Sequence, residues 1–220
     1  MPRYKPVKTR RYFNRAKKYS EIDWNNEMEV FREFKVKLDD WYVQPARALT
    51  RKEHAAFAVL ALTCGLIDTL SQFEVGVARG NRHTFRDWLR KHFTNCARPF
   101  STPIKENATA SSNAAEDYAD AVYFAFRCGI LHQSHSAVYS GIVGQKRTFS
   151  YHRRGLTTYG DGSPCPTVII DPARLLKRVL VVYKAYFKNL LDPSPSHAPL
   201  RQKFKAKFLA DYGIDIGNEP

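Results

Sequence analysis

The chain has few cysteines and no metal-binding pattern. Its 220 residues include only Cys64, Cys96, Cys128 and Cys165, and none of them forms a Cys-x2-Cys pair with another. This spacing argues against a zinc ribbon and against a disulfide framework, and it favours a reducing cytoplasm. No glycine-rich phosphate loop, paired-carboxylate nuclease motif or cluster of metal ligands stands out. We therefore expect no cofactor and no metal-dependent catalysis.

Long apolar runs are also scarce. The longest, residues 55–67, is shorter than the roughly 20 residues that a bilayer-spanning helix needs. The chain does not open on a charged and then apolar leader with a small-residue cleavage site. We therefore expect a cytoplasmic protein with no membrane partner.

Acidic residues are heavily outnumbered. The chain has 35 Lys and Arg residues against 21 Asp and Glu residues, which gives a formal net charge of +14. Such an excess favours a polyanionic partner, with nucleic acid the first choice and an anionic membrane surface the second. The alternative is that the charge only keeps the chain soluble.

The first 20 residues contain no acid at all but hold eight basic side chains, among them Arg10 and Arg11. Four aromatic residues are interleaved with them, and their rings are able to stack on bases. We weigh this RNA-binding arm evenly against an arm that packs its aromatic rings onto the body of the protein.

What the chain does contain is a large apolar share, 44% of its residues, with helical spacing in most segments. We predict a mainly α fold, a bundle of four to six helices. Residues 51–70 are apolar on nearly every side and are expected at its centre. Residues 95–107 hold two prolines and are predicted to be a loop. The predicted helices cover 27–41, 51–77, 84–93, 108–132, 171–191 and 200–212.

Residues 138–170 differ in composition from the helical segments: they are rich in Ser, Thr, Tyr and Gly and contain short alternations of apolar and polar residues. They predict a small β-hairpin insertion, with 167–170 as a third short strand. We divide the chain into a basic N-terminal arm at 1–20, a helical domain at 21–191 that carries this insertion, and a linker with a basic C-terminal helix at 192–220.

Four positions with a proline or a capping residue predict where helices begin and end. Pro45 is expected to end the first helix. Thr50, with Glu53 three residues later, matches a capping box at the start of the second. Thr84 is a candidate cap for the third helix. Asp171, followed by proline, is expected to cap the helix at 171–191.

One short stretch, Phe126-Arg127-Cys128-Gly129-Ile130-Leu131-His132-Gln133, carries the functional hypothesis. It ends a helical pattern in which a buried guanidinium needs a partner. Arg-x4-6-His spacing alone is weak, because it recurs at Arg47/His54, Arg86/His92 and Arg147/His152. The apolar helix and the Gly-Ile-Leu between the two residues set Arg127 and His132 apart.

This motif resembles the signature of HEPN domains, which are all-helical and are often metal-independent endoribonucleases of toxin–antitoxin, abortive-infection and CRISPR-linked defence systems. The resemblance extends over about residues 21–191, but only the short motif is specific. It implies a homodimer with a basic cleft between the motif helices, and a defence-system protein or antitoxin as a further partner. HEPN nucleases commonly have a polar residue where this chain has Cys128, and those modified by a partner often carry a tyrosine where it has Ser134.

The chemistry follows from RNA itself, whose 2′-OH is an internal nucleophile. We expect His132 to be the general acid or base and Arg127 to clamp the scissile phosphate. The products would be 2′,3′-cyclic phosphate and 5′-hydroxyl ends. In an α-helix, however, residues five apart point about 140° away from each other. Either Gly129 loosens the helix, or each site combines residues from two protomers.

Several further residues are candidates for supporting roles. Asp68 is placed to orient Arg127 or His132 through a charge-assisted bond, or else is only a polar residue near a helix end. Cys128 and Gln133 adjoin the motif. The basic hairpin offers phosphate contacts, or alternatively a solvated tip, through Lys146, Arg147, His152, Arg153 and Arg154. The alternative function is a non-catalytic RNA-binding or scaffolding protein that uses the same charge.

Overall fold

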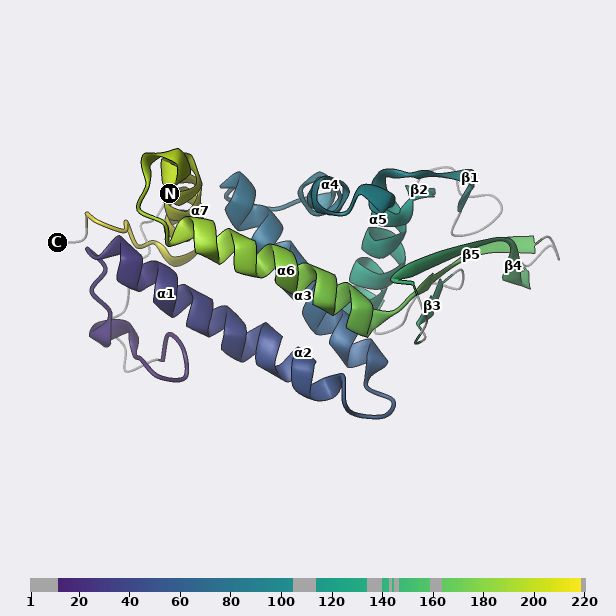
Figure 1. The fold of residues 1–220 in the computed structure, drawn as a ribbon, viewed down its shortest axis with the longest axis horizontal. Helices are drawn as coiled ribbons and strands as arrows, with labels where there is room; N and C mark the ends of the chain where they lie inside the picture. Colours follow the sequence, from purple (N-terminus) through teal and green to yellow (C-terminus); the bar gives the residue numbers. More distant parts are fainter. Residues whose placement is uncertain are drawn as a thin grey trace.

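The computed structural model describes residues 12–104, 114–133, 140–142, 144, 147–158 and 164–218, with backbone only for 129–133 and 154–158. The protein is mainly helical, as predicted, with two small sheets gathered at one end of an elongated molecule (Figure 1). Predicted residues Arg10, Arg11 and Lys146 lie outside the described residues, as do the side chains of His132, Gln133 and Arg154.

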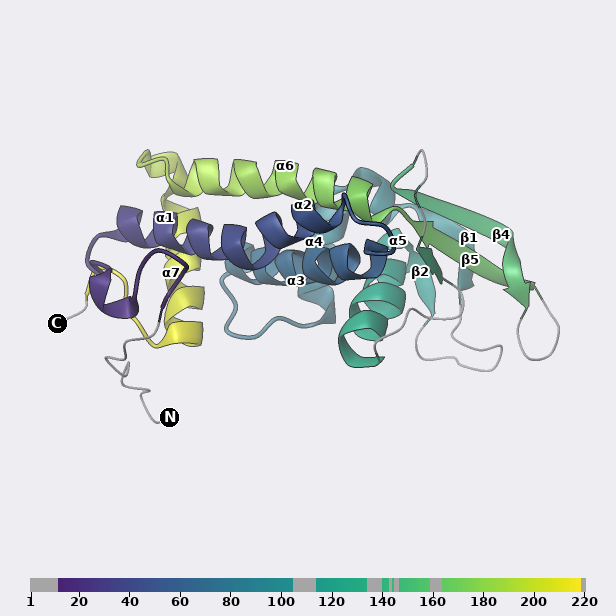
Figure 2. The same ribbon diagram turned by 90° about the horizontal axis from the view of Figure 1, so that it is seen from below.

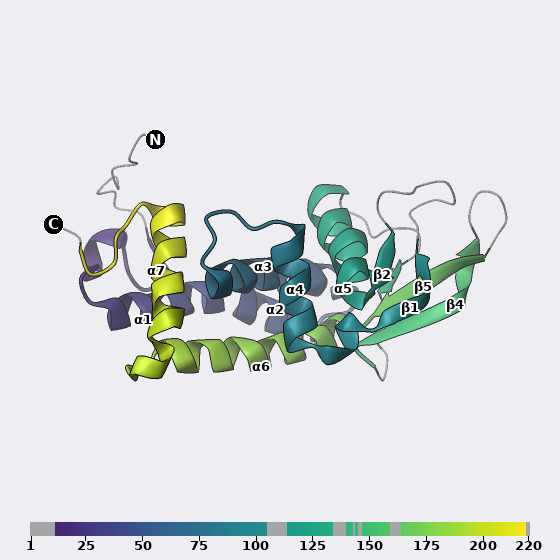
Figure 3. The same ribbon diagram turned by 90° about the horizontal axis from the view of Figure 1, so that it is seen from above.

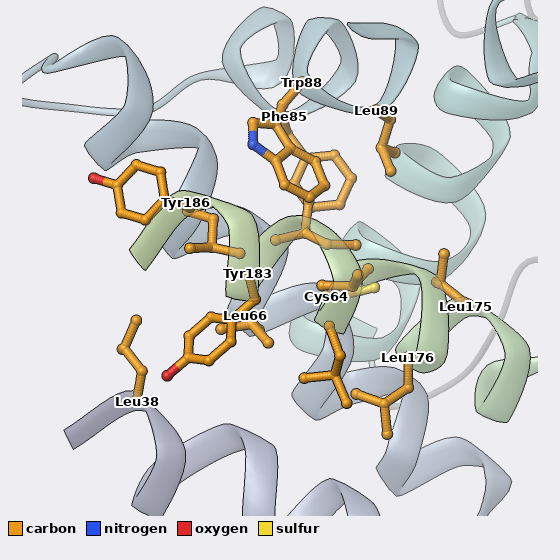
Figure 4. Close-up of a cluster of buried hydrophobic side chains, with 14 of the residues drawn as sticks. Leu38, Cys64, Leu66, Phe85, Trp88, Leu89, Leu175, Leu176, Tyr183 and Tyr186 are labelled. Atoms are coloured by element: carbon orange, nitrogen blue, oxygen red, sulfur yellow. The ribbon is translucent and has the colours of Figure 1, made fainter. Parts of the chain in front are cut away.

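Three long helical elements run side by side along the long axis (Figure 2). The first is α1 continued by α2, the second is α3, and the third is α6. Helix α1 (Glu27–Leu38) begins at Asn26, whose side chain accepts a hydrogen bond from the N–H of Glu29. Helix α3 (Ala56–Val75) packs against α2, α4, α6 and α7, so its predicted central position is confirmed. Side chains from α1, α3, α4 and α6 meet in the core around Cys64 and Leu66 (Figure 4).

The first helical element does not end at Pro45, so that prediction is wrong. A π-helical turn, η2 (Asp39–Val43), follows α1 and leads directly into α2 (Gln44–Leu49). The N–H of Gln44 bonds to the carbonyl of Asp39, five residues earlier. Pro45 therefore falls in the first turn of α2, where a residue without an N–H leaves no hydrogen bond unmade.

The predicted capping box at Thr50 is also wrong. Thr50 closes α2, and its hydroxyl donates to the carbonyl of Arg47 at 2.7 Å. Helix α3 starts at Ala56 without a side-chain cap. Between them His54 takes a positive φ of 61°, which breaks the continuity that a capping box at Thr50 would require.

By length and composition alone, α3 is long and apolar enough to cross a membrane. The unbroken apolar run at 55–67 had predicted a segment too short to do so. Half of its most apolar window is buried inside the protein. The core helix of a globular protein meets the same criterion, and the packing of α3 on four other helices accounts for its composition.

Helix α4 (Arg82–His92) is capped by Asn81 rather than Thr84, because the Asn81 side chain accepts from the N–H groups of residues 83 and 84. Strand β1 (Pro99–Ile104) occupies the segment predicted to be a loop and pairs antiparallel with β2 (Ala115–Asp117). Its two prolines are tolerated because β1 is one edge of a two-stranded sheet.

The β insertion lies where it was predicted, but its pairing differs. Strands β3 (Ser140–Ile142), β4 (Phe149–Thr158) and β5 (Pro164–Ile170) form a sheet in the order β3-β5-β4. Strand β4 pairs antiparallel with β5, and β3 lies parallel to β5. The segment predicted as a third short strand forms the middle of the sheet.

Helix α6 (Pro172–Leu190) is capped by Asp171, which accepts from the N–H of Arg174 at 2.9 Å, so this prediction is confirmed. Helix α7 (Ala198–Tyr212) crosses the long helices at the end opposite the sheets (Figure 3). Phe204 and Phe208 of α7 are fully buried, and Phe13 from the N-terminal segment is buried beside them. Both ends of the described chain therefore complete one hydrophobic core.

Candidate functional site

The motif residues lie on a helix that leaves the two-stranded sheet. Asp117, at the end of β2, caps the short helix α5 (Tyr118–Ala121) by accepting from the N–H of Asp120. The chain then continues as a π-helical segment, η4 (Val122–Gln133). The helix predicted over 108–132 therefore begins only at Tyr118, because residues 115–117 are drawn into the sheet. Its far end points away from α6 (Figure 3).

The π-helical form changes the geometry expected for the motif. A π-helix bonds residues five apart, so positions i and i+5 lie on adjoining turns of one face instead of about 140° apart. Tyr123 and Cys128, five residues apart, are near neighbours: burial and then the closeness of Cys128 raise the pKa of the Tyr123 hydroxyl. By the same spacing, the backbone of η4 presents positions 127 and 132 to the same side.

Arg127 is held by a carboxylate from the central helix. Its Nη2 lies 3.1 Å from Oδ2 of Asp68 on α3, and its guanidinium lies 5.6 Å from the centre of the Tyr123 ring. Both side chains of the ion pair remain partly open to solvent, at 20% and 26% exposed. Although burial acts in the opposite direction, the charge of Asp68 raises the pKa of Arg127. The result is a fixed cation that a ligand in solution is able to reach.

Two cysteines flank this cation. Cys64 on α3 is fully buried, and burial raises the pKa of its thiol to about 12 even though Arg127 lies near it. Cys128 is half-buried, and its contact is with Tyr123. Cys64 therefore remains a neutral thiol at physiological pH.

A second set of charges anchors the start of the motif helix and was not predicted from the sequence. On α4, Arg86 Nε lies 2.7 Å from Oδ1 of Asp120, while Arg90 reaches Asp117 at 2.8 Å and Asp120 at 2.7 Å. Both carboxylates are nearly buried. The Arg86 of the Arg86/His92 pair thus has a structural role. The sequence does carry a signal for these contacts: three acidic residues lie close together at 116–120 in a strongly basic chain.

The predicted basic residues divide between two places. Arg147 lines a cavity of about 590 Å³ together with three arginines that the sequence analysis did not single out, Arg98, Arg174 and Arg178. His152 and Arg153 lie exposed on β4. Among the residues that the structure describes, no group of three His, Cys, Asp or Glu side chains is placed to hold a metal ion.

Comparison of the chain with protein-family models, with curated protein sequences and with solved structures gave no match. The functional argument for this chain therefore depends on its motif, its charge and the geometry of its described residues.

Proposed function

We propose that this protein is a metal-independent endoribonuclease of the HEPN type, with Arg127 and His132 as its catalytic residues. The observation that carries the proposal is the ion pair of Arg127 with Asp68 on a π-helical segment. In a π-helix, positions five apart lie toward one face, which supports a site shared by Arg127 and His132. The charge of +14 supports RNA as the substrate.

The reaction needs only groups that the chain and RNA supply. His132 accepts the proton of the 2′-OH, and the 2′-oxygen attacks the adjacent phosphorus. The bond from phosphorus to the 5′-oxygen breaks, and the proton that His132 took up passes to that leaving oxygen. Arg127 binds the non-bridging phosphate oxygens and stabilises the charge that develops in the transition state. Asp68 acts through Arg127 by fixing its orientation.

The proposal extends to a cytoplasmic homodimer formed through the motif helix, with an antitoxin or another defence-system protein as its regulator. In that dimer two faces, each with an Arg127 and a His132, would line one basic cleft. Light scattering on the full chain should give twice the monomer mass of 25.3 kDa. A mass of one chain at micromolar concentration would contradict the dimer.

Incubating the purified chain with labelled RNA in EDTA tests the catalytic assignment. We expect cleavage in the presence of chelator, and its loss in Arg127→Ala and in His132→Ala. The matched controls are Arg47→Ala and His54→Asn, from a pair with similar spacing on exposed residues. Cleavage that survives in Arg127→Ala, or that EDTA abolishes, would overturn the proposal.

The second candidate function is RNA binding without cleavage. It is favoured by a specific observation, the arginine-lined cavity at the other end of α6 from α7. RNA binding unchanged by either motif substitution, with no cleavage product in any variant, would support this candidate instead.

A further inference from the structure

Strands β1 and β4 and the start of α6 lie at the sheet end of the molecule (Figure 1), and residues of these segments line the cavity of about 590 Å³. Arg98 directly precedes β1 and Phe100 lies in it, Arg147 precedes β4 and Tyr151 lies in it, and the first turns of α6 contribute Arg174 and Arg178. These segments lie far apart in the sequence. The volume falls within the range of about 300–1,000 Å³ that is typical of small-ligand sites.

The charged side chains known to line the cavity are all positive. Four guanidinium groups line it, and none of its described lining residues is Asp or Glu. Arg174 is 3.6 Å from the carboxylate of Asp171. In the part of the chain that the structure describes, no carboxylate is within ion-pair distance of Arg98, Arg147 or Arg178. Like charges gathered with so few counterions are stabilised by a bound anion, and arginine suits phosphate through its forked donors.

The same cavity has an aromatic wall. The rings of Phe100 and Tyr151 stack at 4.5 Å with an angle of 5° between their planes, and the Tyr151 hydroxyl donates to the carbonyl of Thr102 at 2.9 Å. Tyr118 and Phe149, which also line the cavity, stack on each other at 5.2 Å. Both Phe100 and Tyr151 are only half-buried. A flat, partly open ring pair held by a hydrogen bond is a surface on which a nucleobase is able to stack.

From this combination we propose that the cavity binds a nucleotide, with its phosphate on the arginines and its base against the wall of Phe100 and Tyr151. The ligand is either a free nucleotide or one nucleotide of a single-stranded RNA. The proposal does not depend on cleavage at Arg127, because it uses different residues on different elements.

Binding is tested with the full-length His132→Ala protein in EDTA, so that RNA stays intact. The probes are adenosine 5′-monophosphate, adenosine, and a fluorescein-labelled single-stranded octanucleotide RNA. We expect at least one of the two phosphorylated probes to bind about tenfold or more weakly in Arg98→Ala, Arg147→Ala and Tyr151→Leu. The matched control is Arg47→Ala, which removes an exposed arginine outside the cavity.

The two sources of the ligand give different results. If the monophosphate binds and its binding is lost in these variants, the cavity is assigned to a free nucleotide. If the monophosphate does not bind but RNA binding is lost in the variants, the cavity is assigned to an RNA strand. Equal affinity for adenosine and its monophosphate, or binding of both phosphorylated probes unchanged by the variants, overturns the proposal. If Tyr151→Leu fails to fold, the exposed Arg98→Ala and Arg147→Ala substitutions still decide it.

Discussion

At the scale of single residues, the sequence indicated the partner of Arg127 but not most of the other charged contacts. Asp68 stood out because it interrupts an apolar helix, and the structure places it 3.1 Å from Arg127. The arginines of the cavity come from three distant segments, so no local pattern could have grouped them. Asn81 and Thr84 are both capping residues, and only the backbone shows that Asn81 is the cap.

The buried Lys37 leads to a prediction about how the stability of the protein changes with pH. Its side chain is nearly buried, with the ammonium 4.4 Å from the centres of the Phe13 and Trp41 rings and 4.7 Å from that of Tyr212. The ring faces attract the cation. Burial nevertheless lowers the pKa of Lys37 from 10.5 to about 8.

Because the folded pKa of Lys37 lies below the unfolded value, the unfolded chain binds more protons between pH 8 and 10.5. The free energy of unfolding of the native chain should therefore rise with pH across this window relative to Lys37→Met, by about 2 kcal/mol. Urea unfolding of both proteins at pH 7.5 and at pH 10 checks this difference. Equal changes in the two proteins would show that Lys37 titrates normally.

At the scale of elements, helices marked by local signals were predicted well. Asp171-Pro172 gave the start of α6, and its apolar spacing gave the buried face that includes Leu175 and Phe187. The π-helical segments were not predictable, since Pro45 and Gly129 are equally compatible with a helix that ends. Strand β1 depends on pairing with β2, which follows it by ten residues, and pairing across a gap leaves little trace in composition.

The C-terminal helix α7 gives the prediction for this scale. Phe208 is fully buried and stacks on Tyr212 at 4.4 Å, with Phe13 6.2 Å away. Phe208→Ala should lower the free energy of unfolding by about 3–5 kcal/mol, because it leaves a cavity where α7 meets the N-terminal segment. Leu209→Ala, at an exposed position on the same helix, is the matched control and should change it little. A small effect at Phe208 would mean that α7 is an appendage.

At the scale of the whole molecule, we propose two separate contacts with nucleic acid on one basic chain. Different elements build the motif site and the arginine-lined cavity: η4 and α3 carry the Arg127–Asp68 pair, whereas the cavity is lined from the β1, β4 and α6 segments. The sequence predicted a basic, mainly helical protein with a β insertion, and the structure has both the helices and the β insertion. Where the charges gather depends on tertiary packing, which composition does not encode.

The central claim is that Arg127 and His132 cleave RNA through its own 2′-OH. The most direct measurement compares an RNA with a strand of the same sequence that carries one 2′-deoxy nucleotide at the cleaved position, followed by analysis of the product ends by mass spectrometry. The account predicts 2′,3′-cyclic phosphate and 5′-hydroxyl ends from the RNA, and an intact deoxy strand at that position. Cleavage of the deoxy strand there, or products with 3′-hydroxyl and 5′-phosphate ends, would contradict it.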